Sequence, residues 1–202
     1  MLDTAIKTRI DPTLLAMGRW LTRLGATPNA VTVFAFGVGM AAAGAIALGN
    51  FWTGLALILL SRLGDGLDGS LARASGRQTD LGGFLDITLD FAFYGAIPLG
   101  FVIADPVANA VPGAFLLLTF YFNGASFLAY ALMAEKRGID PAQRGQKSLL
   151  YTTGLAEATE TICVFVIFCA FPASFPWIAW LFGAVCLYTA FSRIMLARDT
   201  FR

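Results

Sequence analysis

Long apolar stretches separated by short polar connections follow one another along most of this chain. A helix needs roughly 20 apolar residues to cross a bilayer, and several stretches approach that length. They cover residues 30–48, 51–72, 84–104, 111–134, 155–171 and 176–197. The pattern therefore predicts an all-α fold: an integral membrane bundle of six transmembrane helices.

The segment before the first apolar stretch has a different pattern. Arg19 and Arg23 fall on one side of it, and the other side carries leucines at near-helical spacing, at positions 14, 15, 21 and 24. This is typical of an amphipathic helix that lies along a membrane surface. We expect residues 1–29 to form this interfacial helix and its linker, and residues 30–202 to form the membrane domain. The helix could be a simple anchor or a lid over a cytoplasmic site.

Composition agrees with a membrane location. The chain has 202 residues, of which 57% are hydrophobic and only 13% are charged, whereas soluble domains carry about 25% charged residues. Its 14 basic and 13 acidic residues give a net charge of +1. We expect membrane lipids and no nucleic acid among its partners.

Lysine and arginine are distributed unevenly between the connections. They occur before the first apolar stretch, after the second and the fourth, and at the end of the chain, while the other connections carry none. Short loops rich in Lys and Arg stay in the cytoplasm. We therefore expect a multi-pass protein of the inner (cytoplasmic) membrane with both termini on the cytoplasmic side.

Four aspartates interrupt the second and third apolar stretches. Asp65 and Asp68 are three residues apart near the end of one, and Asp86 and Asp90 are four apart near the start of the next. These spacings place each pair on one helix face. A carboxylate costs about 2.5 to 3.5 kcal/mol at the centre of a membrane helix, so the cluster needs positive charge. Divalent cations are the natural partners.

The two stretches are expected to form an antiparallel hairpin around a polar turn near the cytoplasmic interface. Asp65 would then lie opposite Asp90, and Asp68 near Asp86. Arg62 and Arg73 are expected only as flanking contacts. Two Mg²⁺ or Mn²⁺ ions suit such an all-oxygen site better than zinc, because histidine is absent from the chain. We therefore expect this metal site, and any active site built on it, on the cytoplasmic side.

The motif as a whole resembles the signature of the CDP-alcohol phosphotransferase (CDP-alcohol phosphatidyltransferase) family. All its fixed positions match: Asp65, Asp68, Gly69, Ala72, Arg73, Gly82, Asp86 and Asp90. The segment Thr27-Pro28-Asn29, with Thr32 following, also resembles a stretch found before the first helix of family members. Such a long spaced motif is far more specific than a lone Asp-x-x-Asp pair.

This resemblance implies an enzyme of phospholipid biosynthesis. It would transfer a substituted phosphate from a CDP-linked donor, usually CDP-diacylglycerol, to the hydroxyl of a small alcohol or alcohol phosphate, and release CMP. The four aspartates would bind the two metal ions, and Asp90 would also be the catalytic base. The nucleotide and diphosphate would contact Gly69, Ala72, Arg73, Asn29 and Thr32. The resemblance also implies a homodimer.

Acceptor recognition is open between several residues. Glu157 and Glu160 lie three apart in the fifth stretch, where they could bind acceptor hydroxyls or an ammonium group, or pair with Arg62 or Arg193. A phosphorylated acceptor would need convergent cations, for which the candidates are Arg144, Lys147 and Arg193. The first two could equally contact anionic lipid head groups. The sequence does not choose between glycerol phosphate, inositol phosphate, serine and other alcohols.

Two other classes of membrane protein also use intramembrane acids. A cation-coupled transporter would be expected to repeat its acidic cluster in a second half of the chain, and none is seen. A metal-dependent membrane prenyltransferase would carry its aspartate-rich motif on two helical hairpins, and only one hairpin carries it here. Both remain alternatives to the transferase.

Overall fold

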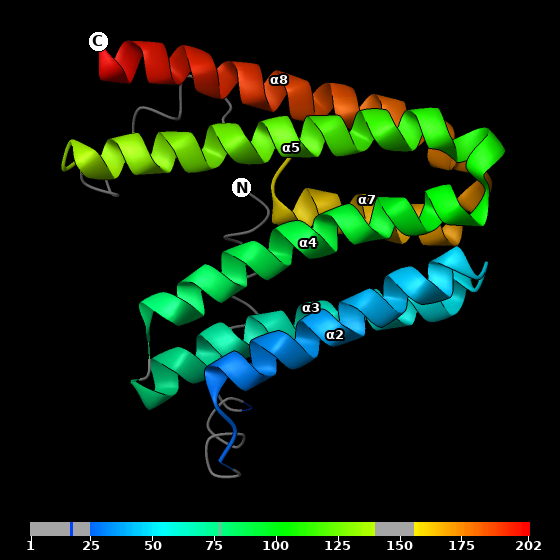
Figure 1. The fold of residues 1–202 in the computed structure, drawn as a ribbon, viewed down its shortest axis with the longest axis horizontal. Coiled ribbons are helices and arrows are strands. Elements are labelled where there is room, and N and C mark those ends of the chain that lie inside the picture. Colours follow the sequence, from blue (N-terminus) through cyan, green and yellow to red (C-terminus); the bar gives the residue numbers. More distant parts are fainter. Residues whose placement is uncertain (1–16, 18–24, 77, 140–155) are drawn as a thin grey trace.

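A computed structural model describes residues 17, 25–76, 78–139 and 156–202, and all regular structure in this part is helical. Figure 1 shows the helices running side by side along one direction. Their bounds are α2 (Pro28–Ala47), α3 (Phe51–Ser75), α4 (Asp80–Ala104), α5 (Pro106–Lys136), α7 (Ala158–Ala170), a short 3-10 helix (Pro172–Ser174) and α8 (Phe175–Phe201). The all-α membrane bundle predicted from hydropathy is confirmed.

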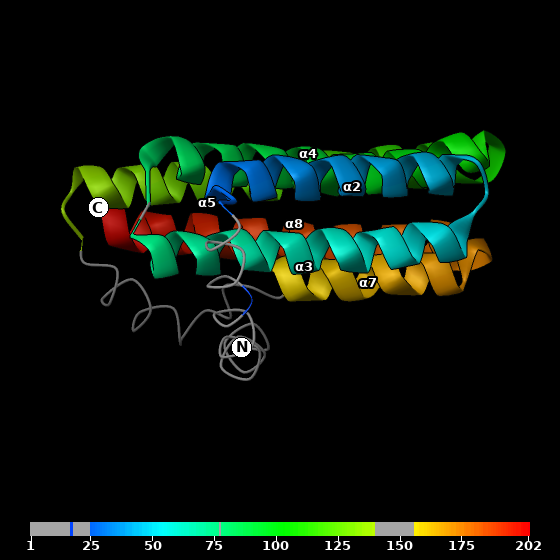
Figure 2. The ribbon, with the colours of Figure 1, turned by 90° about the horizontal axis from the view of Figure 1, so that it is seen from below.

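The helices form two layers. Figure 2 shows α2 and α4 in one layer and α3 with α7 in the other. Helix α2 packs against both α3 and α4, helix α5 packs against α8 and α4, and α7 lies against α3. The α2–α3, α4–α5 and α7–α8 connections meet at one end of the bundle, and the α3–α4 turn and the chain end lie at the other.

Helices α3 and α4 run in opposite directions from their polar turn, as expected, but they differ from a closely packed hairpin. Among the described helices, α3 and α4 do not pack closely along their lengths, because both of them pack on α2 instead. Small residues make this possible: a Cβ atom on Gly64 of α3 would lie 2.8 Å from the Ala35 Cβ of α2, and one on Gly39 of α2 would lie 2.6 Å from the Phe93 ring of α4. The acidic ends of α3 and α4 nevertheless face each other, with side chains rather than backbones in close approach.

Several helices begin earlier than their apolar stretches. Side-chain caps explain this, since an Ncap oxygen satisfies a backbone N–H that the helix leaves free. Thr79 Oγ1 accepts from Gly82 N at 3.1 Å and starts α4. Thr27 and Asp105 cap α2 and α5 in the same way. Each side chain accepts a hydrogen bond from the backbone N–H three residues further along the chain, at 3.3 and 3.1 Å.

Within the described residues, four helices are long and apolar enough to cross a membrane: α2, α4, α5 and the segment that ends in α8. Helix α3 is 25 residues long but carries the charged motif. Helix α7 is shorter than predicted, since it begins at Ala158 and has 13 residues in the part of the chain that the structure describes. Its N-cap residue, Glu157, has extended backbone angles.

Phenylalanine rings fill the interior where α4, α7 and α8 meet. Phe101 of α4 stacks on Phe175 of α8 with ring centroids 4.9 Å apart, and Phe168 of α7 lies 4.7 Å from the same ring. All three side chains are buried. The outside of the bundle is also apolar, with Trp52 and Trp177 exposed near the starts of α3 and α8. Such an exterior is suited to lipid, and interfacial tryptophans are typical of membrane proteins.

The expected interfacial helix lies outside the described residues, apart from position 17 and positions 25–29. Its proposed boundary with the membrane domain, between residues 29 and 30, falls in the first turn of α2, because that helix begins at Pro28.

Candidate active site

Three of the four aspartates come together at the end of the bundle that holds the α3–α4 turn. Asp65 and Asp68 lie one turn apart on α3, and Asp86 faces them from α4. Each offers a carboxylate oxygen, and the three oxygens lie within 4.8 Å of one another. Asp68 is buried, Asp65 is partly buried and Asp86 is exposed. The group therefore opens toward solvent on the α4 side.

The electrostatics of this group favour a cation. Two unit charges 4.8 Å apart repel each other by about 3 kcal/mol at an effective dielectric constant of 20. In addition, Asp68 Oδ2 is buried and has no hydrogen-bond partner among the described residues. A buried acceptor without a donor is costly, and carboxylate oxygens are the ligands that Mg²⁺ and Mn²⁺ prefer. The residues present thus fit a hard divalent cation.

Asp90 has a different neighbour. Its Oδ1 accepts a hydrogen bond from Arg62 Nη1 at 2.7 Å, and the same nitrogen lies 3.4 Å from Asp65 Oδ2. Arg62 therefore lies between two of the acids, which corrects the expectation that it is only a flanking contact. Among the described residues, the ion-pair partners of Arg62 are Asp65 and Asp90, and neither Glu157 nor Glu160 is one of them.

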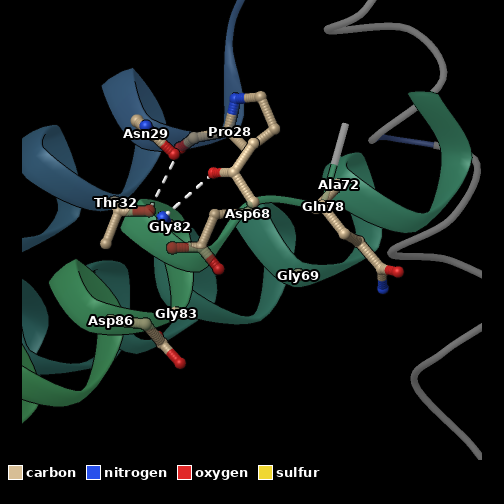
Figure 3. A pocket seen from close by; sticks show the side chains of 11 residues that line it. Pro28, Asn29, Thr32, Asp68, Gly69, Ala72, Gln78, Gly82, Gly83 and Asp86 are labelled. Carbon is tan, nitrogen blue, oxygen red and sulfur yellow. Dashed lines mark hydrogen bonds between the residues drawn. The ribbon is translucent and has the colours of Figure 1, made fainter. Parts of the chain in front are cut away.

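A pocket of about 260 Å³ lies beside the acidic group, and we call it the aspartate pocket. Figure 3 shows that its walls come from α2, α3, α4 and the turn before α4. Its lining residues are Pro28, Asn29, Thr32, Asp68, Gly69, Ala72, Gln78, Thr79, Gly82, Gly83 and Asp86. Four of the five residues predicted to contact a nucleotide or diphosphate are among them.

The fifth of these residues, Arg73, is exposed and does not line the aspartate pocket. Its Nη2 donates to Ser70 Oγ at 3.1 Å, and its Nη1 would lie 3.6 Å from a Cβ atom on Gly69. The guanidinium thus lies next to the Gly69 edge of the pocket. Gly83 has open space around it, since a Cβ atom there would meet nothing within 4 Å.

A larger pocket of about 820 Å³ lies between α4, α5, α7 and α8, and we call it the aromatic pocket. Its charged lining residues are Asp90, Glu157 and Arg193. Aromatic side chains form a large part of its remaining wall: Phe91, Tyr94, Phe120, Tyr121, Phe127 and Tyr130. Asp90 is thus open to this pocket, while Asp68 and Asp86 belong to the other.

Arg193 is held by α5 rather than free in the aromatic pocket. Its Nη1 donates to Asn123 O and Asn123 Oδ1, both at 2.9 Å, and to Ser126 Oγ at 2.6 Å. It is also close enough to Glu157 to interact electrostatically. Glu160 does not line the pocket, and its Oε2 is buried without a hydrogen-bond partner among the described residues.

The other two acceptor candidates, Arg144 and Lys147, lie outside the described residues. Among the residues that the sequence did not single out, Gln78 and Thr79 line the aspartate pocket. The sequence feature that could have indicated them is their position between the two halves of the motif. The aromatic lining residues gave none, because a phenylalanine or tyrosine in an apolar helix looks the same whether it faces lipid, core or cavity.

Comparison with known proteins decides the family. Residues 25–195 match the family model for CDP-alcohol phosphatidyltransferases. The chain belongs to this family. It is therefore a multi-pass membrane protein of a transferase family, and the resemblance seen in the motif is confirmed.

Relatives and solved structures extend this result. The chain is 48% identical to the inner membrane protein YnjF of Escherichia coli over 96% of its own length and 94% of that protein. It is 28% identical to an archaetidylinositol phosphate synthase of Pyrococcus horikoshii, over 72% of this chain and 77% of the other. Its fold matches the crystal structure of a phosphatidylinositol phosphate synthase from Mycobacterium tuberculosis with CDP-DAG bound, with a TM-score of 0.72, 22% identity and coverage of 90% and 92%.

Proposed function

We propose that this protein transfers a phosphatidyl group from CDP-diacylglycerol to the hydroxyl of a small alcohol and releases CMP. The observation that carries the proposal is the division of one motif between two pockets. Asp68 and Asp86 line the aspartate pocket, and Asp90 lines the aromatic pocket. A transferase needs this arrangement, since donor and acceptor must reach one phosphorus atom from different sides.

The aspartate pocket is the proposed donor site. It is small and lined by glycines such as Gly69, Gly82 and Gly83, which leave room for a diphosphate and a nucleotide to lie close to the helices. The structure of a relative with CDP-DAG bound, which shares this fold, supports the choice of donor. Asn29 and Thr32 would contact the donor from α2.

The group of Asp65, Asp68 and Asp86 is the proposed metal site, with Asp90 as the fourth carboxylate of a two-ion site. The orphaned Asp68 Oδ2 supports a cation there. A phosphatidylinositol phosphate synthase of the same fold was solved in complex with manganese and citrate, which supports Mg²⁺ or Mn²⁺. When bound, such ions neutralise the charge of the diphosphate and align it for displacement.

The residues of the chain supply the proton chemistry. The acceptor would lie in the aromatic pocket with its hydroxyl beside Asp90, whose carboxylate takes the hydroxyl proton. The acceptor oxygen then forms a bond to the lipid-bearing phosphorus, the bond between that phosphorus and the CMP oxygen breaks, and CMP leaves with the electron pair. Glu157 and Arg193 line the same pocket and are the proposed contacts for the rest of the acceptor.

The distribution of basic residues indicates which side of the membrane the site faces. We propose that the acidic end of the bundle faces the cytoplasm, in the inner membrane, because the connections at this end carry the lysines and arginines. A lipid donor in the membrane and a water-soluble acceptor would then meet at the interface.

The direct test is CMP release from CDP-diacylglycerol by purified protein with Mg²⁺ or Mn²⁺ and a panel of alcohols and alcohol phosphates. We expect CMP release to depend on one acceptor, to stop on chelation, and to fall at least about 100-fold in Asp90→Asn, because that amide cannot accept the proton. Release of CMP by no member of the panel, or wild-type rates in Asp90→Asn, would contradict the proposal. The same assay rejects a transporter or a prenyltransferase, neither of which forms CMP.

A further inference from the structure

Arg62 is a charged side chain that contacts aspartates beside both pockets. Its guanidinium lies 2.7 Å from Asp90 Oδ1 and 3.4 Å from Asp65 Oδ2, so it touches both the acid of the aromatic pocket and the acidic group beside the aspartate pocket. Only 15% of its side chain is exposed. It lines neither pocket itself. We therefore expect Arg62 to act on the reaction through the aspartates that it contacts.

The guanidinium is fixed from three sides. It lies over the ring of Phe93, with its central carbon 4.0 Å from the ring centroid. Its Nη2 donates to Ser61 Oγ at 3.3 Å, and Ser61 Oγ donates to Ala35 O of α2 at 2.8 Å. Phe93 and Ser61 are fully buried. A guanidinium held by a ring face and a hydrogen-bonded chain has little freedom to move.

This fixed guanidinium sets the position of Asp90. Its Nη1 donates a hydrogen bond to Asp90 Oδ1, and Asp90 also lines the aromatic pocket, so the second carboxylate oxygen is available to an acceptor there. Asp90 itself has 28% of its side chain exposed, so without Arg62 its carboxylate could rotate toward water or toward the other acids. Misplacement of a catalytic group by about 1 Å can cost about 100-fold in rate.

We propose that Arg62 is a positioning residue for phosphatidyl transfer: it holds Asp90 with one carboxylate oxygen directed at the acceptor and ties it to Asp65. This inference rests on the proposed function, in which Asp90 is the base. Arg62 does not touch the substrates. Its loss should therefore slow turnover while leaving donor binding intact, and we expect the slower turnover to arise from the misplaced Asp90.

The test compares Arg62→Met and Arg62→Lys with wild type. Methionine keeps an apolar side chain over Phe93 but removes the charge, and we expect kcat to fall about 100-fold with donor KM within about threefold of wild type. Lysine keeps the charge but lacks the planar fork that can reach two acids and Ser61. We expect the kcat of Arg62→Lys to lie between those of wild type and Arg62→Met. Such a partial rescue would show that the planar shape of the guanidinium matters in addition to its charge.

A double mutant separates positioning from packing. In an Asp90→Asn background, Arg62→Met should cause no further loss of CMP release in single-turnover assays, because the residue it positions is already disabled. The apparent Tm gives a readout apart from activity: Arg62→Met leaves two acids without their cation and should lower it, and Asp90→Asn added to Arg62→Met should restore part of the loss.

Arg137→Met is the matched control. Arg137 also lies over a phenylalanine, Phe201, at 5.4 Å, but it donates to the carbonyl oxygens of Thr200 and Phe201 and lies far along the chain from the motif. Its loss should leave kcat unchanged.

Three results would overturn the inference: kcat within about threefold of wild type in Arg62→Met, losses that multiply in the double mutant, or wild-type kcat in Arg62→Lys. If Arg62→Met fails to fold, the kcat of Arg62→Lys alone tests the inference. Failure of the proposed function is a distinct result, since it would appear as absence of CMP release by the wild-type protein.

Discussion

At the scale of single residues, the four aspartates of one motif have two kinds of surroundings. Asp65, Asp68 and Asp86 each place a carboxylate oxygen within 4.8 Å of the others, where like charges repel, and Asp65 also lies 3.4 Å from Arg62. Asp90 has an arginine as its fixed partner. Similar residues at regular spacing can thus have different roles, because the neighbouring helices determine the charge that each carboxylate meets.

Gly83 tests whether the aspartate pocket binds the donor. A Cβ atom at this position meets nothing within 4 Å, so Gly83→Ala should fold as well as wild type, and it should gain up to about 1 kcal/mol in helix propensity. The added methyl group occupies pocket space, however. We expect donor KM to rise about tenfold in CMP-release assays while Tm is unchanged or higher.

Gly37→Ala is the control for this prediction. Gly37 also lies in a helix with nothing within 4 Å of an added Cβ atom, but it does not line the aspartate pocket. Its donor KM should equal that of wild type. Equal donor KM values in Gly83→Ala and wild type would mean that the donor does not approach this wall.

The sequence predicted that Asp65, Asp68 and Asp86 lie together but did not predict the position of Arg62, for a physical reason. Helical spacing alone places Asp65 and Asp68 on one face, whatever the rest of the chain does. The direction of Arg62 depends on Phe93 and on Ser61, whose own partner is Ala35 of another helix. Contacts of that kind come from packing between helices, which spacing along one helix does not contain.

At the scale of helices, hydropathy identified the elements and missed some of their ends. The predicted start at position 84 became Asp80, because Thr79 caps α4 and an acid in the first turn suits the positive end of the helix dipole. Counting apolar residues ignores such polar starts. A threonine cap, Thr27, likewise explains why α2 begins at Pro28. In both helices the added turn contributes lining residues to the aspartate pocket.

The contact between α2 and α3 can be tested at Gly64. A methyl group there would lie 2.8 Å from Ala35 Cβ, and the two atoms belong to helices that pack against each other. We expect Gly64→Ala to destabilise the fold by about 1–3 kcal/mol, as overpacking of a close interface does. Thermal unfolding in detergent would measure the effect as a lower Tm.

Gly44→Ala provides the comparison, because Gly44 lies on α2 with nothing within 4 Å of an added Cβ atom. Its Tm should be at least that of wild type. A Tm in Gly64→Ala equal to that of Gly44→Ala would show that α2 and α3 are not in close contact beside the motif.

At the scale of the whole molecule, the bundle follows from hydropathy but its layering does not. Apolar stretches of membrane length favour helices, since a helix satisfies its own backbone hydrogen bonds in lipid. Nothing in those stretches indicates that α2 packs on both α3 and α4. That choice depends on where small residues such as Gly39 and Gly64 let two backbones approach. Assembly into a homodimer stays a prediction.

The orientation of the bundle gives a prediction for the whole chain. Asn50 lies in the α2–α3 connection and Arg202 at the chain end, at opposite ends of the bundle, and both are exposed. Single cysteines would be placed at each position in a chain whose native cysteines, Cys163, Cys169 and Cys186, are replaced by alanine.

In intact cells, a membrane-impermeant maleimide should label Asn50→Cys and leave Arg202→Cys unlabelled, because basic connections stay in the cytoplasm. Permeabilised cells should label both. The reverse pattern in intact cells would place the aspartate pocket outside, away from any nucleotide-linked donor made in the cytoplasm, and would contradict the proposed location.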